Sequence, residues 1–300
     1  MSALAARNLT KVINDKTIVD SVSFELRPGE VFGFLGPNGA GKTTTIRMLV
    51  GLIRPTEGVV EICGYDIRKH FEEAMRCIGC IVENPDLYRF MTGRENLQHF
   101  ARMLGAGNGE IERVAELVNL AHRLDQRVGT YSLGMRQRLG IAQAMLGSPR
   151  VLILDEPSNG LDPAGIREMR ELLRRLALDH NLAVFVSSHL LGEVELMCDR
   201  VAIIHRGRIL TDGPVSELIS SRRAMEFKVN DVPAAMEVFR ASGLGPQASG
   251  ETILLAIEES DAPPLIAALV REGIEVFHAR PKIQTLEEMF IEVTGGESVD

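Results

Sequence analysis

The sequence predicts an α/β protein with a mostly parallel central sheet, followed by a small α+β domain. Three observations support this prediction. A compact apolar run at 31–35 leads into a glycine-rich loop and then a helical segment. Apolar strand-like runs and helical segments continue to alternate to about residue 218. Beyond about residue 220 the composition changes and the expected elements become shorter.

Length and composition indicate two globular domains. The chain has 300 residues, room for one large domain and one smaller one, and we expect them at 1–220 and 221–300. The net charge of −8 argues against broad binding to nucleic acid, so no nucleic-acid partner is expected. No segment reaches the ~18 apolar residues of a membrane span, and the N-terminus lacks a signal-peptide pattern. We therefore expect a cytoplasmic chain that attaches to a membrane only through partners.

The first part of the chain predicts strands around a glycine loop. Alternating polar and apolar residues at 5–10 and 22–26 predict antiparallel strands. The apolar run 31–35 predicts a buried parallel strand. The glycine-rich stretch 36–41 interrupts it, and 42–52 predicts a helix. Strand, glycine loop and helix in this order are the context that a phosphate-binding loop requires.

Helices dominate the middle of the chain. Apolar residues recur at helical spacing through 94–127, so we expect an inserted helical subdomain at about 90–150. Buried strands are predicted at 151–154 and 183–186, with a helix at 166–178 between them. Strands separated by helices favour a parallel sheet.

The last part predicts a small domain of alternating strands and helices. Strands are expected near 225–229, 252–257 and 275–279, and helices near 233–242, 264–272 and 285–293. This order favours a ferredoxin-like α+β domain.

The four cysteines are too few for a disulfide framework. Cys77 and Cys80 form a CxxC, but a zinc site normally needs a second pair of ligands. Small buried strand residues are therefore the favoured reading, and metal or redox use is the alternative. The set is Cys63, Cys77, Cys80 and Cys198.

Residues 36–43, GPNGAGKT, match the phosphate-loop pattern GxxxxGK[ST] in full. Glycines let backbone N–H groups point at phosphates, and the start of the next helix adds its dipole. Lys42 is expected to reach the β- and γ-phosphates of ATP, and the Thr43 hydroxyl to bind Mg²⁺. The candidate nucleotide-binding residues are Gly36, Asn38, Gly39, Gly41, Lys42, Thr43 and Thr44.

Two carboxylates end the predicted strand 151–154. Ligands of open α/β sheets bind at the carboxyl ends of strands, where Asp155 and Glu156 follow. Asp155 suits the Mg²⁺ shell, and Glu156 suits a general base that orients the attacking water. Acidic residues often end strands, so the two carboxylates indicate a nucleotide site only in combination with the phosphate loop.

The segment 131–140, YSLGMRQRLG, resembles the signature sequence of ATP-binding-cassette (ABC) proteins, whose usual core is LSGGQ. In that family the segment begins a helix and closes over the γ-phosphate bound by the opposite subunit. The resemblance assigns this contact to the Ser132 hydroxyl and the Gly134 N–H. Four positions match the pattern and three depart from it: Ser132, Gly134, Gln137 and Arg138 against Tyr131, Leu133 and Met135.

Further motifs follow in the order of the family. Asn159-Gly-Leu-Asp162 resembles the D-loop, which runs along the dimer seam in ABC proteins. Ser187-Ser-His189 stands where the family has its switch histidine. A histidine there can hydrogen-bond the γ-phosphate and hold the water and Glu156 in place, although a histidine at the end of a strand can also be structural.

Two positions depart from the common ABC pattern. Glu83 stands where most members have a glutamine, and we predict that its carboxylate coordinates Mg²⁺ or a bound water; the alternative is a surface acid in a loop. Ile13 stands where the family places an aromatic residue against adenine, so apolar contact is expected without stacking.

The resemblance covers about 3–220 and is closest to exporters of the bacitracin-resistance and lantibiotic-immunity type. It implies a homodimer of ATP-hydrolysing subunits holding ATP and Mg²⁺ at its seam. Separate transmembrane permease subunits would carry a drug, antibiotic or peptide, with this chain on the inner face of the membrane. The tail 286–294 resembles the C-terminal extension of several such subunits.

Two other functions remain to be weighed. ABC-type ATPases of DNA repair carry long coiled coils between phosphate loop and signature, whereas the interval here is short and lacks heptads. Ribosome-associated members usually carry two cassettes, and only one phosphate loop occurs here. A regulatory module that binds ATP without hydrolysing it would be expected to lack Glu156 or His189.

Overall fold

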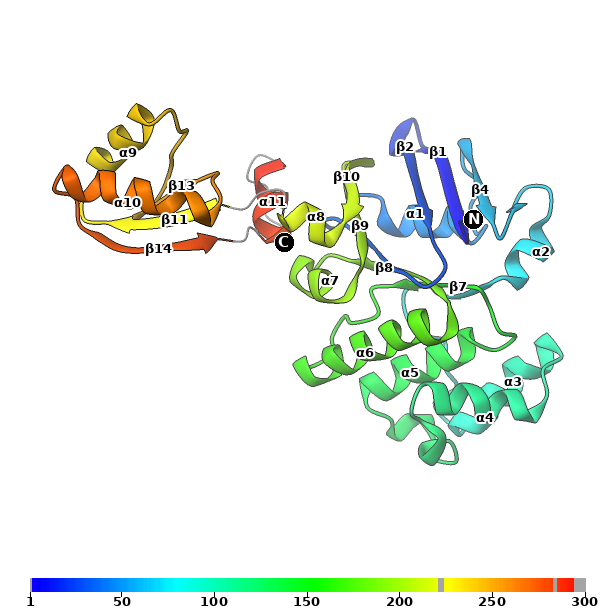
Figure 1. Cartoon of the computed structure of the whole chain (residues 1–300). Helices are drawn as coiled ribbons and strands as arrows, with labels where there is room; N and C mark the ends of the chain where they lie inside the picture. Colours follow the sequence, from blue (N-terminus) through cyan, green and yellow to red (C-terminus); the bar gives the residue numbers. More distant parts are fainter. Residues whose placement is uncertain (1, 221–223, 283–284, 294–300) are drawn as a thin grey trace. The chain divides into compact units, whose positions relative to one another are not determined.

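The computed structural model describes residues 2–220, 224–282 and 285–293 (Figure 1). The chain forms two compact units, Met1–Pro214 and Val215–Glu292.

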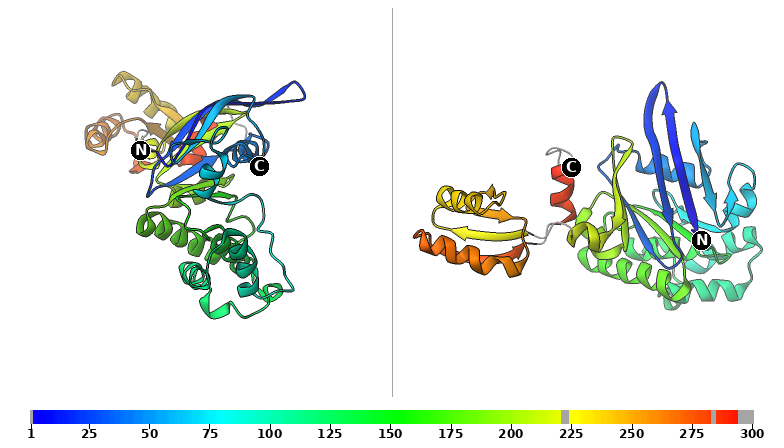
Figure 2. Two further views of the ribbon diagram at one scale, coloured as in Figure 1. Left: turned by 90° about the vertical axis from the view of Figure 1, so that its right-hand side faces the viewer. Right: turned by 45° about the horizontal axis from the view of Figure 1, so that its top comes forward.

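An antiparallel sheet occupies the start of the first unit. Its order is β2-β1-β4-β5, with β1 (Leu4–Ile13), β2 (Lys16–Leu26), β4 (Glu57–Ile62) and β5 (Tyr65–Asp66). The β1–β2 hairpin is longer than predicted and projects beyond its neighbours (Figure 2). Asn14 and Asp15 both have positive φ, 47° and 61°, in the two-residue turn that pairs Ile13 with Lys16. Such turns match the twist of paired strands, so the hairpin extends to its tip.

The mostly parallel sheet predicted from sequence is confirmed. Its order is β10-β9-β3-β8-β7-β6, and all neighbours are parallel except β10 with β9. Strands β3, β8 and β7 are adjacent and are buried along their whole length. Because they are parallel, their carboxyl ends lie side by side. The strands are β3 (Val31–Leu35), β6 (Ile78–Ile81), β7 (Val151–Asp155), β8 (Ala183–Ser188), β9 (Arg200–His205) and β10 (Arg208–Pro214).

Aromatic rings join the two sheets of this unit. Phe24 of β2 lies within 5.4–5.7 Å, between ring centroids, of Phe32, Phe34 and Phe185. All four rings are buried. Aromatic pairs at this spacing add to the energy of burial, so the antiparallel sheet is held against the catalytic strands.

The helical block consists of α3, α4 and α5, with short 3-10 turns at Ala121–Arg123 and Val128–Thr130. Figure 1 shows it beside α6, on the side of the parallel sheet opposite the antiparallel strands. Within the described residues, no helix is long and apolar enough to cross a bilayer. The helices are α1 (Lys42–Leu49), α2 (Phe71–Arg76), α3 (Gly93–Leu104), α4 (Asn108–Leu117), α5 (Leu133–Ala144), α6 (Pro163–His180) and α7 (Leu191–Met197).

The second unit has the β-α-β-β-α-β order of a ferredoxin-like domain. All strands of its sheet, in the order β12-β13-β11-β14, pair antiparallel. The short strand β12 was absent from the prediction; Thr294 of the predicted tail motif lies outside the described residues. The elements are α8 (Val215–Ser220), β11 (Ala224–Val229), α9 (Val232–Ala241), β12 (Gln247–Ser249), β13 (Thr252–Leu255), α10 (Ala262–Arg271), β14 (Val276–Lys282) and α11 (Leu286–Val293).

Candidate active site

The glycine loop between β3 and α1 has a backbone shape that side chains would not permit. A Cβ at Gly36 would lie 2.2 Å from the Ile204 carbonyl oxygen. Gly39 and Gly41 have φ of 80° and 109°, in the left-handed region that favours glycine. Successive turns of this kind direct backbone N–H groups toward an anion. Asn38 is exposed in the loop, and Thr43 and Thr44 are half-buried on the first turn of α1.

Lys42, the first residue of α1, folds back over the loop. Its Nζ donates to the Gly36 carbonyl oxygen at 2.7 Å and lies 3.4 Å from Glu156 Oε1. The side chain is only 6% exposed. Burial lowers the pKa of Lys42, and the Glu156 carboxylate opposes that shift. A buried cation therefore stands at the position where the loop would receive phosphates.

Asp155 ends β7 and is held by the neighbouring strand β8. The Ser187 hydroxyl donates to Asp155 Oδ1 at 2.5 Å and accepts from the Glu156 N–H at 3.0 Å. Asp155 and Ser187 are paired residues of the parallel register, which brings these groups together. Sequence reasoning quoted Ser187 within the histidine motif but assigned it no role. Its hydroxyl orients both acidic residues at once.

Glu156 and His189 meet at the ends of β7 and β8. His189 Nδ1 lies 2.9 Å from Glu156 Oε2, and the two side chains are 27% and 24% exposed. Glu156 has φ of 50°, in the left-handed region that few non-glycine residues adopt. The structure thus brings Lys42, Glu156 and His189, from three separate segments, into one partly open cluster.

The signature segment and the D-loop pack on each other. Ser132 caps α5, and its hydroxyl accepts from the Met135 N–H at 3.2 Å. A Cβ at Gly134 would lie 3.8 Å from Leu161 Cδ2, and one at Gly160 would lie 3.2 Å from Leu133 Cδ2. Among the described residues, these contacts do not bring Ser132 or Gly134 to the Lys42 cluster.

Glu83 and Ile13 are exposed residues on other segments of the first unit. Glu83 has φ of 67° and a side chain that is 62% exposed, and its Oε1 lies 2.6 Å from Arg47 Nη2 on α1. Ile13 is 43% exposed at the end of β1. The β1–β2 hairpin borders the glycine loop, because a Cβ at Gly41 would lie 3.0 Å from the Ile18 carbonyl oxygen.

One polar contact near the site was not foreseen from the sequence. The Ser158 hydroxyl donates to Glu193 Oε2 at 2.5 Å, and Ser158 is 5% exposed. Ser158 follows Glu156 by two residues, and Glu193 lies on α7, which follows His189. This bond runs beside the Glu156–His189 contact and joins the same two segments. No local pattern pairs residues this far apart in the chain, so only the fold reveals it.

Comparison with known proteins agrees with these motifs. The family model described as "ABC transporter" matches residues 19–159. The ABC transporter ATP-binding protein YhcH of Bacillus subtilis is 50% identical over 296 residues, covering 98% of this chain and 96% of that protein. The bacitracin transport ATP-binding protein BcrA of Bacillus licheniformis is 41% identical, covering 97% of each chain. The Nod factor export ATP-binding protein I of Burkholderia lata is 36% identical, covering 98% and 97%.

Solved structures show the same fold. A structure described as an ATP-binding subunit of an ABC transporter is 31% identical, with a TM-score of 0.65, and covers 73% of this chain and 93% of its own. CbiO1 of Clostridium perfringens, described as part of the transporter complex cbiONQ, is 25% identical with a TM-score of 0.68, covering 73% and 91%. The chain therefore belongs to the ABC transporter family, as an ATP-binding and ATP-hydrolysing subunit.

Proposed function

We propose that this chain drives the export of a peptide-like antibiotic or a similar drug through separate permease subunits. The observation that carries the proposal is the 41% identity to the bacitracin transport protein BcrA over 97% of both chains. The Nod factor export protein, at 36% identity, supports export rather than uptake.

Lys42 and the glycine loop would hold the phosphates of ATP. The buried Lys42 cation is partly balanced by Glu156 at 3.4 Å, and an arriving γ-phosphate would take over that ion pair. This exchange would free the Glu156 carboxylate to act as a general base. Loss of the lysine charge should therefore weaken ATP binding as well as turnover.

Mg²⁺ fits the oxygen donors at this site. Thr43 supplies a hydroxyl and Asp155 a carboxylate, the ligand types that Mg²⁺ prefers. Ser187 engages Asp155 Oδ1, and we assign the other carboxylate oxygen to the ion. When bound, Mg²⁺ would neutralise charge on the β- and γ-phosphates.

Glu156 would act as the general base and His189 as its positioning partner. A half-buried carboxylate at the end of β7 can accept a hydrogen bond from the attacking water and then its proton. The 2.9 Å contact with His189 Nδ1 restrains that carboxylate. We also propose that His189 hydrogen-bonds the γ-phosphate, which would couple base position to the presence of ATP.

Ser132 and Gly134 would complete the site of a second copy. Their placement at the exposed start of α5, packed on the D-loop, supports a head-to-tail homodimer with ATP at the seam. A helix N-terminus is a ready site for a phosphate group. Closure on ATP and release on hydrolysis would then follow from γ-phosphate contacts across the seam.

Glu83 and Ile13 are proposed ligands at the margin. For Glu83 to coordinate Mg²⁺ or its water, the carboxylate must leave Arg47. Exposure of Ile13 on the hairpin that borders the loop supports apolar contact with the adenine.

A cluster of aromatic side chains is our candidate for contact with the permease at the inner face of the membrane. Tyr88 lies 5.9 Å from Phe90 and 5.3 Å from His99 between ring centroids, and Phe90 is 73% exposed. The cluster follows Glu83 in the chain and leads into α3. A permease bound here would contact the segment that connects Glu83 to the helical block.

We further propose that 221–300 is an accessory domain distinct from the ATPase domain 1–220. The compact unit Val215–Glu292, with its own core around Phe227 and Phe239, supports this division. Limited proteolysis should cut near residue 220 and leave two protected fragments.

The test is a pull-down of tagged Glu156→Gln chain with ATP from detergent-solubilised host membranes. The amide should keep ATP bound and the dimer closed, so a multi-span membrane protein should co-purify in near-stoichiometric amount. The control is the double variant with Lys42→Ala, which should lose ATP and the closed dimer. Recovery of ribosomes or DNA-associated proteins with the closed dimer, and no membrane protein, would refute the transporter role.

A further inference from the structure

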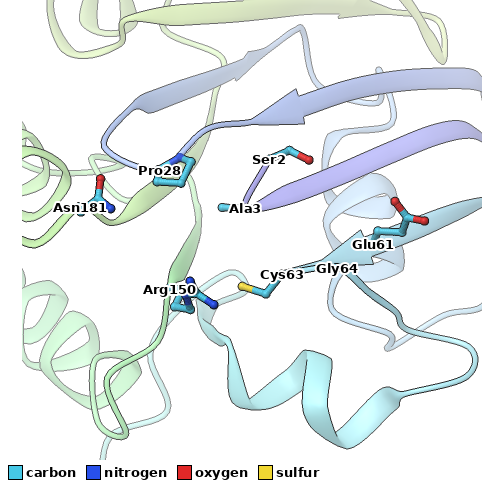
Figure 3. A pocket seen from close by; sticks show the side chains of 8 residues that line it. All are labelled: Ser2, Ala3, Pro28, Glu61, Cys63, Gly64, Arg150 and Asn181. Carbon is cyan, nitrogen blue, oxygen red and sulfur yellow. The ribbon is translucent and has the colours of Figure 1, made fainter.

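A cavity of about 510 Å³ lies at the amino ends of the three central strands (Figure 3). Pro28 precedes β3, Arg150 precedes β7 and Asn181 precedes β8, and all three residues line the cavity. The carboxyl ends of the same strands lead into the glycine loop, Glu156 and His189. Because these strands are parallel, the cavity is a separate site at the edge of the sheet opposite the ATP site.

Backbone hydrogen bonds hold the walls of this cavity in place. The Cys63 N–H donates to the Ala3 carbonyl oxygen at 2.8 Å, which joins the β4–β5 turn to the start of β1. The Arg150 N–H donates to the Cys77 carbonyl oxygen at 2.9 Å, and the Arg150 carbonyl oxygen accepts from the Ala183 N–H at 3.1 Å. The walls are therefore fixed without a ligand, as in most sites for small molecules.

Arg150 brings an unpaired positive charge to the cavity. Figure 3 shows its side chain directed toward Cys63. Among the residues that the structure describes, no carboxylate forms an ion pair with this guanidinium. Glu61 also lines the cavity, but its Oε2 lies 2.8 Å from Arg7 Nη1, and Figure 3 shows it on the side away from Arg150. The cavity therefore favours a ligand with one negative charge.

The rest of the lining indicates which kind of anion fits. Ala3 and Pro28 supply apolar surface, and Asn181 supplies a side-chain amide. A guanidinium binds a carboxylate through two parallel hydrogen bonds. The single charge of a carboxylate matches that of Arg150, whereas a phosphate carries close to two charges at neutral pH. Apolar walls with few polar groups are typical of sites for small organic molecules.

We propose that this cavity binds a small organic monocarboxylate, with the carboxylate on the Arg150 guanidinium and the apolar part against Ala3 and Pro28. The ligand would contact the base of β7 and the edge of the antiparallel sheet at the same time. A molecule that binds only the folded chain adds to its stability, so occupancy should raise the unfolding temperature. ATP would bind at the other end of the same strands.

The Cys63 thiol reports occupancy, because it lines the same cavity. The full-length, unsubstituted chain is treated with iodoacetamide, and labelling of Cys63 is followed by peptide mass spectrometry with and without 3-phenylpropanoate. Burial raises the pKa of Cys63 to about 11, so the reaction is run at mildly alkaline pH. With a Kd of about 1 mM, about 10 mM of this probe should slow the labelling about tenfold. The exposed Cys80 of β6 should react at an unchanged rate.

Matched probes test the chemistry of the ligand. The neutral 3-phenylpropanamide and inorganic phosphate should not protect Cys63 at the same concentration. Phenylalanine adds an ammonium group to the same carboxylate and should protect less, because that group would lose water while Glu61 is already paired with Arg7. Equal protection by the amide, by phosphate or by phenylalanine would overturn the proposal, as would no protection by 3-phenylpropanoate.

Variants identify the residue that binds the carboxylate. Arg150→Met removes the guanidinium but keeps both backbone hydrogen bonds, so it should weaken 3-phenylpropanoate binding at least about tenfold. ATP binding should be unchanged, which shows that the variant is folded. Arg102→Met, at an exposed arginine of α3, is the matched control and should bind the probe as the wild type does. Isothermal titration calorimetry measures these constants without thiol chemistry, and equal affinity in the two variants would overturn the assignment to Arg150.

Discussion

Ser187 offers the sharpest test of how the two acidic residues are held. Its hydroxyl donates to Asp155 Oδ1 and accepts from the Glu156 N–H, and Ser187 is fully buried. Ser187→Ala removes the oxygen alone and leaves little empty volume. The Glu156 N–H keeps the Ser187 carbonyl oxygen as a partner at 3.2 Å, so the main loss is the donor to the buried Asp155 carboxylate.

The expected size follows from the charge on that acceptor. A hydrogen bond to a charged group contributes about 1.5–3 kcal/mol, so unfolding free energy should fall by that order. If the same energy positions Asp155 during turnover, kcat should fall about ten- to hundredfold. Ser188→Ala is the matched control, because within the described part of the chain its buried hydroxyl accepts only from the neutral Leu190 N–H, at 3.0 Å. That neutral bond is worth about 1 kcal/mol.

The assay combines phosphate release under saturating ATP with urea unfolding of both variants. Ser187→Ala should lose more stability and far more turnover than Ser188→Ala. Wild-type kcat and KM in Ser187→Ala, with stability reduced as in the control, would show that the hydroxyl serves folding alone. The role given to Ser187 would then be refuted.

Three further predictions concern the same unit. Ser158→Ala and Glu193→Ala should each lower kcat with little change in the KM for ATP, because each removes the hydrogen bond beside the Glu156–His189 contact. Glu193→Gln keeps an acceptor oxygen and should restore much of kcat. Equal defects in Glu193→Gln and Glu193→Ala would contradict a positioning role. Gly36→Ala should abolish ATP binding, because its Cβ would lie 2.2 Å from a backbone oxygen. The Cβ of Gly39→Ala meets no described atom within 4 Å, so its positive φ should lower the free energy of unfolding by only about 1–2 kcal/mol. Thermal unfolding and ATP titration compare the two variants, and equal tolerance would contradict the steric reasoning. Burial raises the pKa of Glu30. As pH rises above the ordinary glutamate value of about 4.3, the wild type should therefore lose stability relative to Glu30→Gln. Urea unfolding from acid to neutral pH measures the difference in unfolding free energy, and a difference that stays constant with pH would contradict this prediction.

Several features followed from local patterns in the sequence. The glycine loop needs a strand before it and a helix after it, and 31–52 supply all three in order. Alternating and unbroken apolar runs distinguished antiparallel strands from buried parallel ones, since one sheet has a solvated face and the other does not. The β1–β2 turn could also have been predicted, because Asn14-Asp15 suits the left-handed conformations that a two-residue hairpin requires.

Pairings between distant residues could not be predicted in the same way. The cysteines of the CxxC were expected to be small buried strand residues, but Cys77 is a half-buried residue at the end of α2 and Cys80 is an exposed residue of β6. Glu83 was expected near Mg²⁺, and its carboxylate instead pairs with Arg47; the magnesium role stays a prediction. Neither outcome has a signal at short spacing, because both depend on which loops pack together.

The sequence by itself determined the family and the fold class, and it named the candidate residues of the ATP site. Those features depend on short segments, in which residue type and spacing specify the local backbone. Only the tertiary structure decided which side chains touch: Lys42 with Glu156, His189 with Glu156, Ser187 with Asp155 and Ser158 with Glu193. These contacts arise from the register of parallel strands whose neighbours are far apart in the chain, and register is set by packing of the whole sheet.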